Sequence, residues 1–317
     1  MFTMRYDIQV GDYKLGMLEK VEINRSVELL ADTAVITLPG AEYNVALDVE
    51  SKIKRGDPVV ISLGYEETGM VEEFRGWVQR VGTDGGSITL ECEDDLFKFR
   101  VSLKNQQRTN ITLASLLKLV VDGIGGGYNI DCSYSWTYEK FTINNATGFD
   151  VLKKVQEESG ADIYIQDDTL HVHAPGQKVG KDIIYDFAQN VQSCNLNYRR
   201  ADERKVQVVV KAVMPDGKVK EKHYGSTGGD KVTVKCATSD DASMKLRGEA
   251  EHKRLSFDGY DGSITTWLVP HVIPGDSAEL YDADYEYKNG RYYVRAVKTE
   301  FGSDGGTREI ELGFRLS

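Results

Sequence analysis

A short motif that occurs twice constrains the fold of this chain more than any other feature. Residues 53–65 read IKRGDPVVISLGY, and residues 272–282 read VIPGDSAELYD. In both, an apolar residue shortly precedes Gly-Asp, and a stretch that alternates between apolar and polar side chains follows. A chain that repeats such a strand-opening motif in each half is expected to contain the same β unit twice.

The residues after each motif extend the likeness. Residues 73–94 read EFRGWVQRVGTDGGSITLECED, and residues 289–314 read NGRYYVRAVKTEFGSDGGTREIELGF. Each block consists of a strand, a Gly-Gly turn and a strand with charged outward residues. Hairpins in general favour such turn residues, so convergence is an alternative. Two matched blocks in the same order favour duplication.

Residues 1–103 are predicted to form a first β module. The turn at Gly11-Asp12 and the turn at residues 84–86 are hairpin signals. In residues 87–94, apolar side chains such as Ile88 alternate with polar ones such as Thr89, with the period of two that a half-buried strand requires. Six or seven short strands of this kind predict a closed or nearly closed barrel.

Residues 104–175 change character and predict a small α+β domain. Apolar residues at helical spacing indicate a helix after Thr112 or Asn110, either of which can cap it. A second helix begins at Thr147, with Asp150 placed for a capping box, and stops at Gly160. A hairpin that turns at residues 167–168 follows.

Residues 176–317 are predicted to be a second β-barrel module. It contains a hairpin over residues 215–217 and a helix over residues 239–257 capped by Ser239. The predicted fold class is therefore mainly β with an α+β insert, formed by two duplicated tube-type β-barrel modules plus a small α/β domain. A homotrimer of such a two-module chain would present six similar modules around one axis.

The charge balance limits the partners. Acidic residues outnumber basic ones by 50 to 39, for a formal net charge of -11. This argues against a protein that grips nucleic acid through its phosphates, although DNA could pass by without being held. No apolar run approaches the roughly 18 residues that would span a bilayer, and no secretory signal is visible. The four cysteines have no C-x-x-C spacing, which is typical of a reduced protein made in the cytosol.

Two groups of side chains could hold a metal. His171 and His173 lie two residues apart on one predicted strand face, but no third ligand is suggested nearby, so an ordinary strand face is favoured. Asp282, Asp284 and Glu286 have the alternate spacing of a calcium loop, yet the glycine comes late and the twelfth-position Glu is missing. A hairpin turn at residues 289–290 accounts for this stretch better.

No pattern points to catalysis. The glycine-rich residues 122–129 follow a helix, whereas a dinucleotide site would precede one. The carboxylate pairs at residues 157–158 and 167–168 would serve a glycosidase only if a cleft framed them. The RGD at residues 55–57 opens a strand and is a chance match. No catalytic, cofactor-binding or metal-binding residue is assigned, and the chain is predicted not to be an enzyme.

The aromatic residues leave one binding alternative open. Trp77, Trp136, Trp267 and the tyrosine-rich residues 281–293 could stack on sugars or peptides if exposed. Packing in a core or across strands uses the same residue types and is favoured.

The blocks GDPVVISLGYEE and EEFRGWVQRV resemble the baseplate hub proteins of tailed phages. This group includes the late control protein D family, the Mu-like hub and the base portion of VgrG. The stretch DVLKKVQEESGADIYIQDDTLHV is similar to the small α/β domain of that family. The stretches WLVPHVIPGDSAEL and GRYYVRAVKTEFGSDGGTREIELGF, with the helix before them, are similar to its second tube barrel. The resemblance covers nearly the whole chain.

The resemblance implies a structural protein of a phage tail or a phage-like contractile injection apparatus. It implies a homotrimer with a pseudo-six-fold ring that joins the tail tube to the central spike and contacts other baseplate proteins. The protein would belong to the virion and be made in the bacterial cytoplasm, without inserting into a membrane. A ring that passes DNA is expected to have an acidic or neutral lumen. The alternatives are a β-rich carbohydrate-binding protein or adhesin, and a cell-wall hydrolase or its accessory.

Overall fold

The computed structural model describes residues 2–39, 52–84, 86–200, 205–214 and 216–317. Most of its strands belong to one 13-stranded sheet in which nearly all neighbours are antiparallel. The strands from the first half are β1 (Met4–Val10), β2 (Tyr13–Lys14), β3 (Lys20–Ser26), β4 (Thr33–Leu38), β5 (Pro58–Tyr65), β6 (Gly69–Asp84) and β7 (Ser87–Glu93). The strands from the second half are β13 (Asp182–Asp186), β14 (Ser193–Arg199), β18 (Gly259–Trp267), β19 (Ser277–Tyr281), β20 (Gly290–Gly302) and β21 (Gly305–Arg315).

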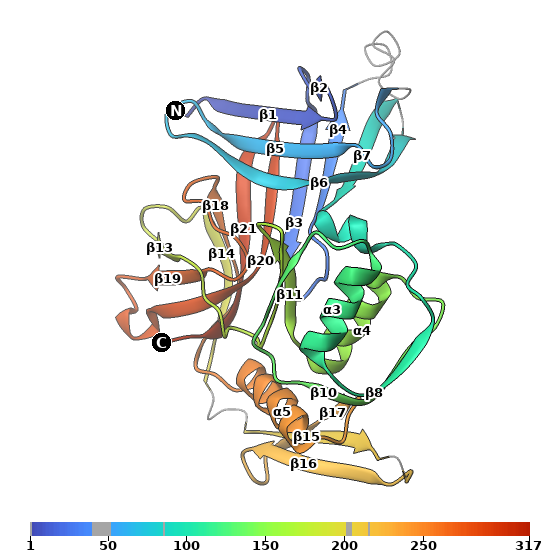
Figure 1. Cartoon of the computed structure of the whole chain (residues 1–317). Helices are drawn as coiled ribbons and strands as arrows, with labels where there is room; N and C mark the ends of the chain where they lie inside the picture. Colours follow the sequence, from blue (N-terminus) through green and yellow to red (C-terminus); the bar gives the residue numbers. More distant parts are fainter. Residues whose placement is uncertain (1, 40–51, 85, 201–204, 215) are drawn as a thin grey trace.

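The order of the strands shows that the two halves share one sheet. It runs β14-β18-β21-β20-β3-β4-β7-β6-β5-β1-β2, and β19 pairs with β20 and with β13. Strand β20 pairs with β3 from Ala296↔Ser26 to Gly302↔Lys20, which joins the second half to the first. Figure 1 shows β1, β5 and β6 running across the upper ends of β3, β4, β20 and β21.

The predicted mainly β class is confirmed, but the predicted closed or nearly closed barrels are wrong. Among the residues that the structure describes, no module closes on itself. Strand β3, at one end of the first-half strands, pairs with β20 of the second half, and β1, near the other end, pairs with β2 and β5. The hydrogen bonds that would close a module are therefore used to join two modules.

The longest strands, β6 and β20, bend the sheet. Strand β6 pairs with β5 through its first half and with β7 through its second, and its register shifts between Val78 and Arg80. Strand β20 pairs with β19 and then with β3, with shifts between Tyr292 and Ala296. Bulges of this kind increase local twist, which lets one strand serve two parts of a curved sheet.

Each half has its own apolar core. Alternate residues of β3, β4 and β7, such as Ile23, Ile36 and Leu90, are fully buried against β1, β5 and β6. The second half has a separate cluster that includes Ile264 and Ile310. Leu268 and Phe301 of the second half pack into the first core, so the halves share apolar contacts as well as hydrogen bonds.

The predicted α+β insert forms beside the large sheet. It contains helices α3 (Leu113–Gly123) and α4 (Gly148–Ser159), the strand pair β8 (Gln106–Thr112) and β10 (Thr137–Ile143), and the three-stranded sheet of β9 (Asn129–Cys132), β11 (Asp162–Gln166) and β12 (Thr169–His173). Short 3-10 helices lie at Asp95–Phe99 and Glu286–Lys288.

Several local signals in this insert are confirmed. Thr112 caps α3 by accepting from the Ser115 N–H. Thr147 and Asp150 form the expected capping box of α4, and Gly160 ends that helix in the left-handed conformation. The β11–β12 hairpin turns at residues 167–168, both at positive φ.

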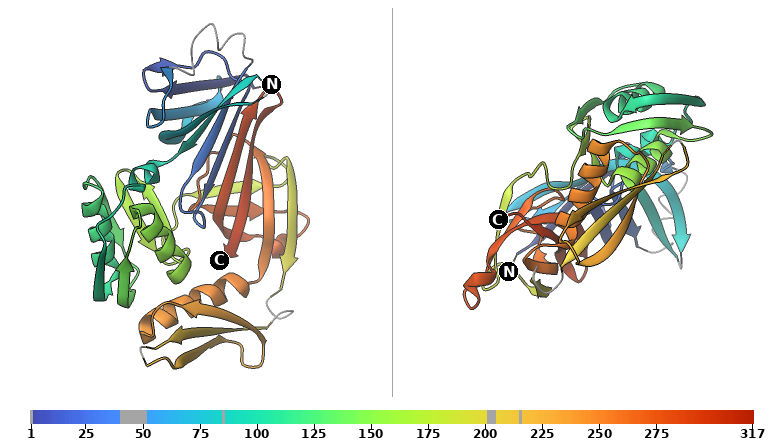
Figure 2. Two further views of the ribbon diagram at one scale, coloured as in Figure 1. Left: turned by 90° about the vertical axis from the view of Figure 1, so that its right-hand side faces the viewer. Right: turned by 90° about the horizontal axis from the view of Figure 1, so that it is seen from below.

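Residues between β14 and β18, which the sequence predicts as part of the second barrel, form a further unit. Strands β15 (Val206–Val213), β16 (Val219–Gly225) and β17 (Asp230–Cys236) make a separate sheet, covered by helix α5 (Asp241–Leu255). The predicted helix is present, but its N-cap is Asp240 rather than Ser239. Val208 and Met244 of this unit pack into the same core as α3 and α4. Figure 2 shows this unit next to the α+β insert and below the large sheet.

Candidate functional site

The first Gly-Asp motif forms a tight turn that opens β5. Gly56 has a φ of +93° and donates its N–H to the Val78 carbonyl at 2.8 Å. The Asp57 carboxylate accepts the Lys54 N–H at 2.8 Å and so closes the turn on itself. The positive φ requires glycine, and the carboxylate satisfies an N–H that the turn leaves unpaired.

The second motif forms the same turn before β19. Gly275 also has a φ of +93° and donates its N–H to the Val294 carbonyl at 2.9 Å. The Asp276 carboxylate accepts the Ile273 N–H at 3.0 Å. The repeated motif therefore encodes one structural device, used at equivalent points of both halves.

Strand pairing around the two turns is also the same. The five strands β3-β4-β7-β6-β5 and β14-β18-β21-β20-β19 follow one another in the same order. Ile36 pairs with Leu90 in the first set, and Ile264 pairs with Ile310 in the second. The fourth strands of the two sets, β6 and β20, also have matching valines: Val78 and Val294 each precede a register shift. Chance convergence of hairpins does not explain so many shared details, and duplication does.

The duplication predicts that two open strand edges are equivalent to two strands that already pair with each other within the chain. Within the chain, β20 of the second set pairs with β3 of the first. The equivalent strands are β6 and β14. Over residues 80–84, β6 pairs with β7 alone, and β14 pairs with β18 alone, as far as the described residues show. An open strand edge presents unpaired N–H and C=O groups to a further strand.

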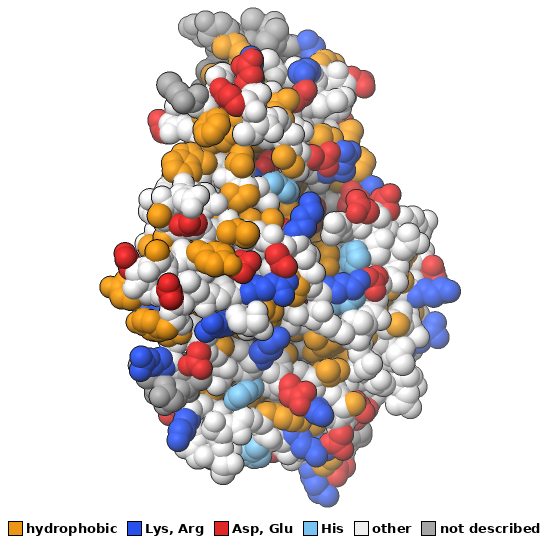
Figure 3. All heavy atoms as spheres, turned by 90° about the vertical axis from the view of Figure 1, so that its left-hand side faces the viewer, with side chains coloured by type: hydrophobic (Ala, Val, Ile, Leu, Met, Phe, Trp, Pro, Cys, Tyr) orange, Lys and Arg blue, Asp and Glu red, His pale blue; other side chains and the backbone are white. Residues whose placement is uncertain are grey.

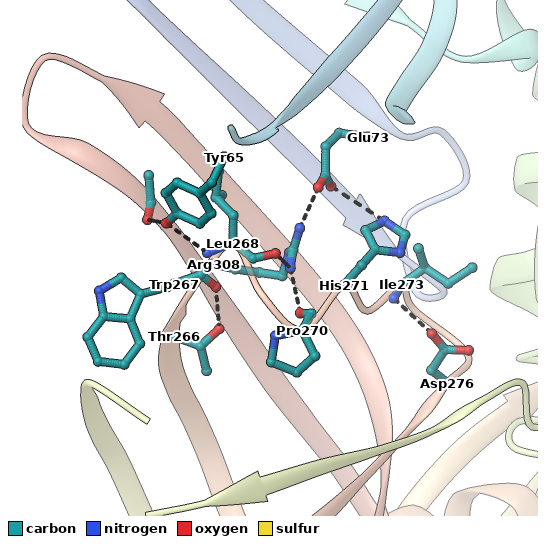
Figure 4. Close-up of polar contacts among 11 residues, drawn as sticks. Tyr65, Glu73, Thr266, Trp267, Leu268, Pro270, His271, Ile273, Asp276 and Arg308 are labelled. Carbon is teal, nitrogen blue, oxygen red and sulfur yellow. Dashed lines mark hydrogen bonds and ion pairs between the residues drawn. The ribbon is translucent and has the colours of Figure 1, made fainter. Parts of the chain in front are cut away.

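A buried ion pair links the two halves (Figure 4). Arg308 of β21 is fully buried and donates to the carbonyls of Leu268 and Pro270 at 2.6 and 2.7 Å. Its second nitrogen donates to Glu73 of β6 at 2.5 Å. His271 Nε2 lies 3.7 Å from the other Glu73 oxygen. The pair joins residues that lie 235 positions apart.

Electrostatics in this cluster favour a structural role. Burial raises the pKa of Glu73, whereas Arg308 and Arg25 act to lower it. Burial, with the positive charge of Arg308, lowers the pKa of His271 to about 4, so this imidazole is neutral at pH 7. The guanidinium of Arg308 is fully buried and held by two carbonyls and a carboxylate, so it connects the two halves.

A neighbouring cavity of about 580 Å³ bears on the hydrolase alternative, because carboxylates line it. Asp32 pairs with Arg25 at 2.8 Å, and the Asp94 carboxylate accepts the Asp32 and Leu96 N–H groups. Burial and the adjacent Asp32 raise the pKa of Asp94. Asp32 and Asp94 thus cap and connect local backbone. The carboxylate pair considered from the sequence, Asp167 and Asp168, also lines this cavity, together with Glu72 and Asp95.

The predicted histidine pair gains a third residue. His171 and His173 of β12 share a face, and Asp131 of the parallel strand β9 pairs with His171. The Asp131 carboxylate lies 3.1 Å from His171 Nδ1 and 3.5 Å from His173 Nε2. Lys178 also forms an ion pair with Asp131. Sequence reasoning missed Asp131 because the residue lies 40 positions earlier and only the strand register brings it here.

The other sequence candidates are separated or engaged elsewhere. The predicted turn at residues 289–290 is wrong, because β19 and β20 are joined by a longer loop with a 3-10 helix. In that loop Asp282 accepts the Asp284 and Tyr285 N–H groups. Gly125, Gly126 and Gly127, with positive φ, follow α3 as a helix stop. All four cysteines are free.

The aromatic candidates divide into buried and exposed residues. Trp136 lies in the core at 1% exposure, and Trp77 donates to Asp95 at 2.7 Å beneath Lys98. Trp267 is 42% exposed. Other large apolar side chains of the second half are exposed as well: Ile184, Val269, Tyr281, Tyr285 and Tyr287. Figure 3 views the side on which β13 and β19 lie in Figure 1, where hydrophobic side chains are interspersed with charged ones.

Solved structures similar to this chain include two tail proteins. A tail protein from Neisseria meningitidis MC58 matches with a TM-score of 0.67 at 14% identity, over 99% of this chain and 97% of that one. The 43 kDa tail protein of prophage MuSo2 from Shewanella oneidensis matches with a TM-score of 0.66 at 14% identity, over 98% of both chains. Neither the sequence models of known families nor the curated proteins give a match.

A third match extends the fold to a secretion machine. The E. coli c3393 protein, a component of the type VI secretion system with structural similarity to T4 tail proteins gp27 and gp5, has a TM-score of 0.63 at 9% identity, over 98% of this chain and 77% of that one. The chain therefore has the fold of phage tail proteins and their secretion-system counterparts. At the level of fold, this confirms the resemblance drawn from the sequence. No helix of the described residues has the length and apolar character needed to cross a membrane.

Proposed function

We propose that the protein is a non-enzymatic structural hub of a phage tail or phage-like contractile injection apparatus. The observation that carries this proposal is the duplicated five-strand unit with one internal junction, β20 to β3, and one equivalent pair of open edges, β6 and β14. The near full-length likeness to tail proteins supports it. We propose the division into residues 1–103, 104–175 and 176–317, with residues 206–255 projecting from the last part.

The open edges support a homotrimer. If β6 of one chain pairs with β14 of the next as β20 pairs with β3, internal and intermolecular junctions alternate around the ring. Three chains then present six similar units, and no open edge remains at these positions. Such a ring can stack on a six-fold tail tube and carry a three-fold spike on its other side. Both of these proteins, with other baseplate components of the virion, are the proposed partners.

The charge of the sheet fits a channel through which DNA passes unheld. On β3, β6, β7, β20 and β21, the residues that alternate with the core form a polar face, and we assign this face to the lumen. It carries the carboxylates Glu22, Glu91, Glu300, Glu309 and Glu311 and the cations Lys20, Arg80, Arg295 and Lys298, of which Arg295 pairs with Glu311. Five negative against four positive groups make it close to neutral, and a channel of this charge does not bind phosphates.

Native mass spectrometry across a concentration series, with negative-stain images of the largest species, tests the proposal. A species near three times 35.4 kDa with a central hole is expected. Adding the tail tube and spike proteins of the same apparatus covers the case in which the ring closes only on its partners. A chain that stays monomeric alone and with those proteins would refute the hub.

A further inference from the structure

Three side chains on the polar face of the β11-β12-β9 sheet are already placed like metal ligands. The Asp131 carboxylate oxygen lies 3.1 Å from His171 Nδ1 and 3.5 Å from His173 Nε2, and all three ligand atoms lie within 4.8 Å of one another. In a tetrahedral zinc site with bonds of about 2.0–2.1 Å, neighbouring ligand atoms are about 3.3 Å apart. The two short separations match this spacing without movement of the strands.

Hydrogen bonds fix the tautomer of His173. Gln177 Oε1 accepts the Ala174 N–H at 3.3 Å, so this atom is the carbonyl oxygen of the amide. It also accepts the Ser133 hydroxyl proton at 3.0 Å. Ser133 has no second proton, so its contact of 2.6 Å with His173 Nδ1 must be donated by the imidazole. In the neutral imidazole, the lone pair of His173 is therefore on Nε2, the atom that faces Asp131.

This lone pair is a buried group that needs a cation. The His173 side chain is 2% exposed, and Nε2 has no hydrogen-bond partner among the described residues. It faces a carboxylate oxygen, so two acceptors point at each other, which is unfavourable unless a positive charge lies between them.

We propose that Asp131, His171 and His173 bind a zinc ion, with water as a fourth ligand and Lys178 as its competitor. In the metal-free protein, Lys178 neutralises Asp131. Its side chain is 47% exposed, so the ammonium can turn into water when the metal arrives. The ion would tie β9 to β12. This inference is independent of the hub proposal.

The test uses tag-free full-length protein, stripped with a chelator and titrated with Zn²⁺ by calorimetry and with Co²⁺ by visible absorption. One zinc per chain and the strong absorption of four-coordinate Co²⁺ are expected. Asp131→Asn and His171→Gln should each weaken binding by about tenfold or more, because each removes a ligand. Lys178→Met should tighten binding by removing the competing charge.

His223→Gln is the matched control, because His223 is an exposed histidine on β16, outside the cluster. It should leave the affinity unchanged, and circular dichroism should show that every variant is folded. The proposal is overturned if neither the wild-type protein nor Lys178→Met binds one equivalent of zinc. It is equally overturned if binding survives Asp131→Asn or if Lys178→Met binds no tighter.

Discussion

At the scale of single residues, the buried carboxyl of Asp162 makes the stability of the folded protein depend on pH. Burial raises the pKa of Asp162 from 3.8 to about 7, against hydrogen bonds from the Tyr293 hydroxyl at 2.9 Å and the Gly176 N–H at 3.4 Å. The folded state therefore holds a proton that the unfolded state releases between pH 4 and 7. Stability from this group is complete below about pH 4 and is lost as the pH rises to about 7.

Asp162→Asn should remove this dependence. Both hydrogen bonds use the same carboxylate oxygen, so the amide oxygen can accept them without a buried charge. Between pH 5 and pH 8, the free energy of unfolding of the variant relative to the wild type should rise by at most about 3 kcal/mol. Urea unfolding of both proteins at each pH measures this. Parallel pH profiles would show that Asp162 does not titrate in this range.

The Glu73–Arg308 pair predicts a large cost at one residue. Glu73→Ala leaves the Arg308 guanidinium, which is fully buried, without its counter-ion and should destabilise by about 3–5 kcal/mol. Glu66→Ala is the matched control, because Glu66 pairs with Arg5 where both side chains are 57% exposed, and it should cost less than about 1 kcal/mol. Urea unfolding compares the two variants. Equal losses would mean that the buried pair does not hold the halves together.

At the scale of elements, the duplicated Gly-Asp turn allows a comparison within one molecule. Asp276 is 4% exposed and accepts a second N–H, from Lys181 at 2.8 Å, which ties the segment just before β13 to the turn. Asp57 is less buried, and its carboxylate accepts the Lys54 N–H alone among the contacts of the described residues. Asp276→Ala should cost about 2–4 kcal/mol and Asp57→Ala about 1 kcal/mol. Thermal unfolding of the two variants side by side gives the difference, and an equal or reversed order would contradict this account.

Elements were predictable where their signals are local. The capping box of α4, the stop at Gly160 and the turn at residues 167–168 depend on a few neighbouring residues, and each is present. The two-residue turn predicted at residues 289–290 was wrong, because the Asn289 side chain accepts the Asp282 N–H and so closes a longer loop. A side chain that bonds backbone seven positions away competes successfully with a two-residue turn.

At the scale of the whole molecule, the sequence did not predict which strands of the two halves pair with each other. Each strand of both halves shows its period of two, but nothing in β3 or β20 states that they pair with each other rather than close two barrels. Arg308 and Glu73 meet across 235 positions, and Asp131 meets His171 through a parallel register. Long-range pairing of this kind is set by the packing of all elements together, so duplication was visible in the sequence whereas the continuous sheet was not.

The duplication predicts the register between neighbouring chains of the proposed ring. Inside the chain, Lys298 of β20 pairs with Asn24 of β3. Gly82 of β6 is equivalent to Lys298, because they pair with Thr89 and Glu309 at matching points of β7 and β21. Asn197 of β14 is equivalent to Asn24, because they pair with Asp261 and Thr33 at matching points of β18 and β4. Gly82 should therefore lie opposite Asn197 of the next chain.

Disulfide cross-linking tests this register in a background in which the exposed Cys194 is replaced by Ser. Gly82→Cys with Asn197→Cys should give covalent dimers and trimers on oxidation, since a Cβ at Gly82 meets only ordinary contacts and directly opposed strand residues are within disulfide reach. Lys298→Cys with Asn24→Cys should cross-link within one chain. Gly82→Cys with Asn195→Cys, two residues out of register, should react poorly because diagonal neighbours are about 7–8 Å apart. If the chain forms a trimer but the Asn195 pair reacts as fast as the Asn197 pair, the ring closes through a junction unlike the internal one, and the two halves are equivalent in fold without being equivalent in assembly.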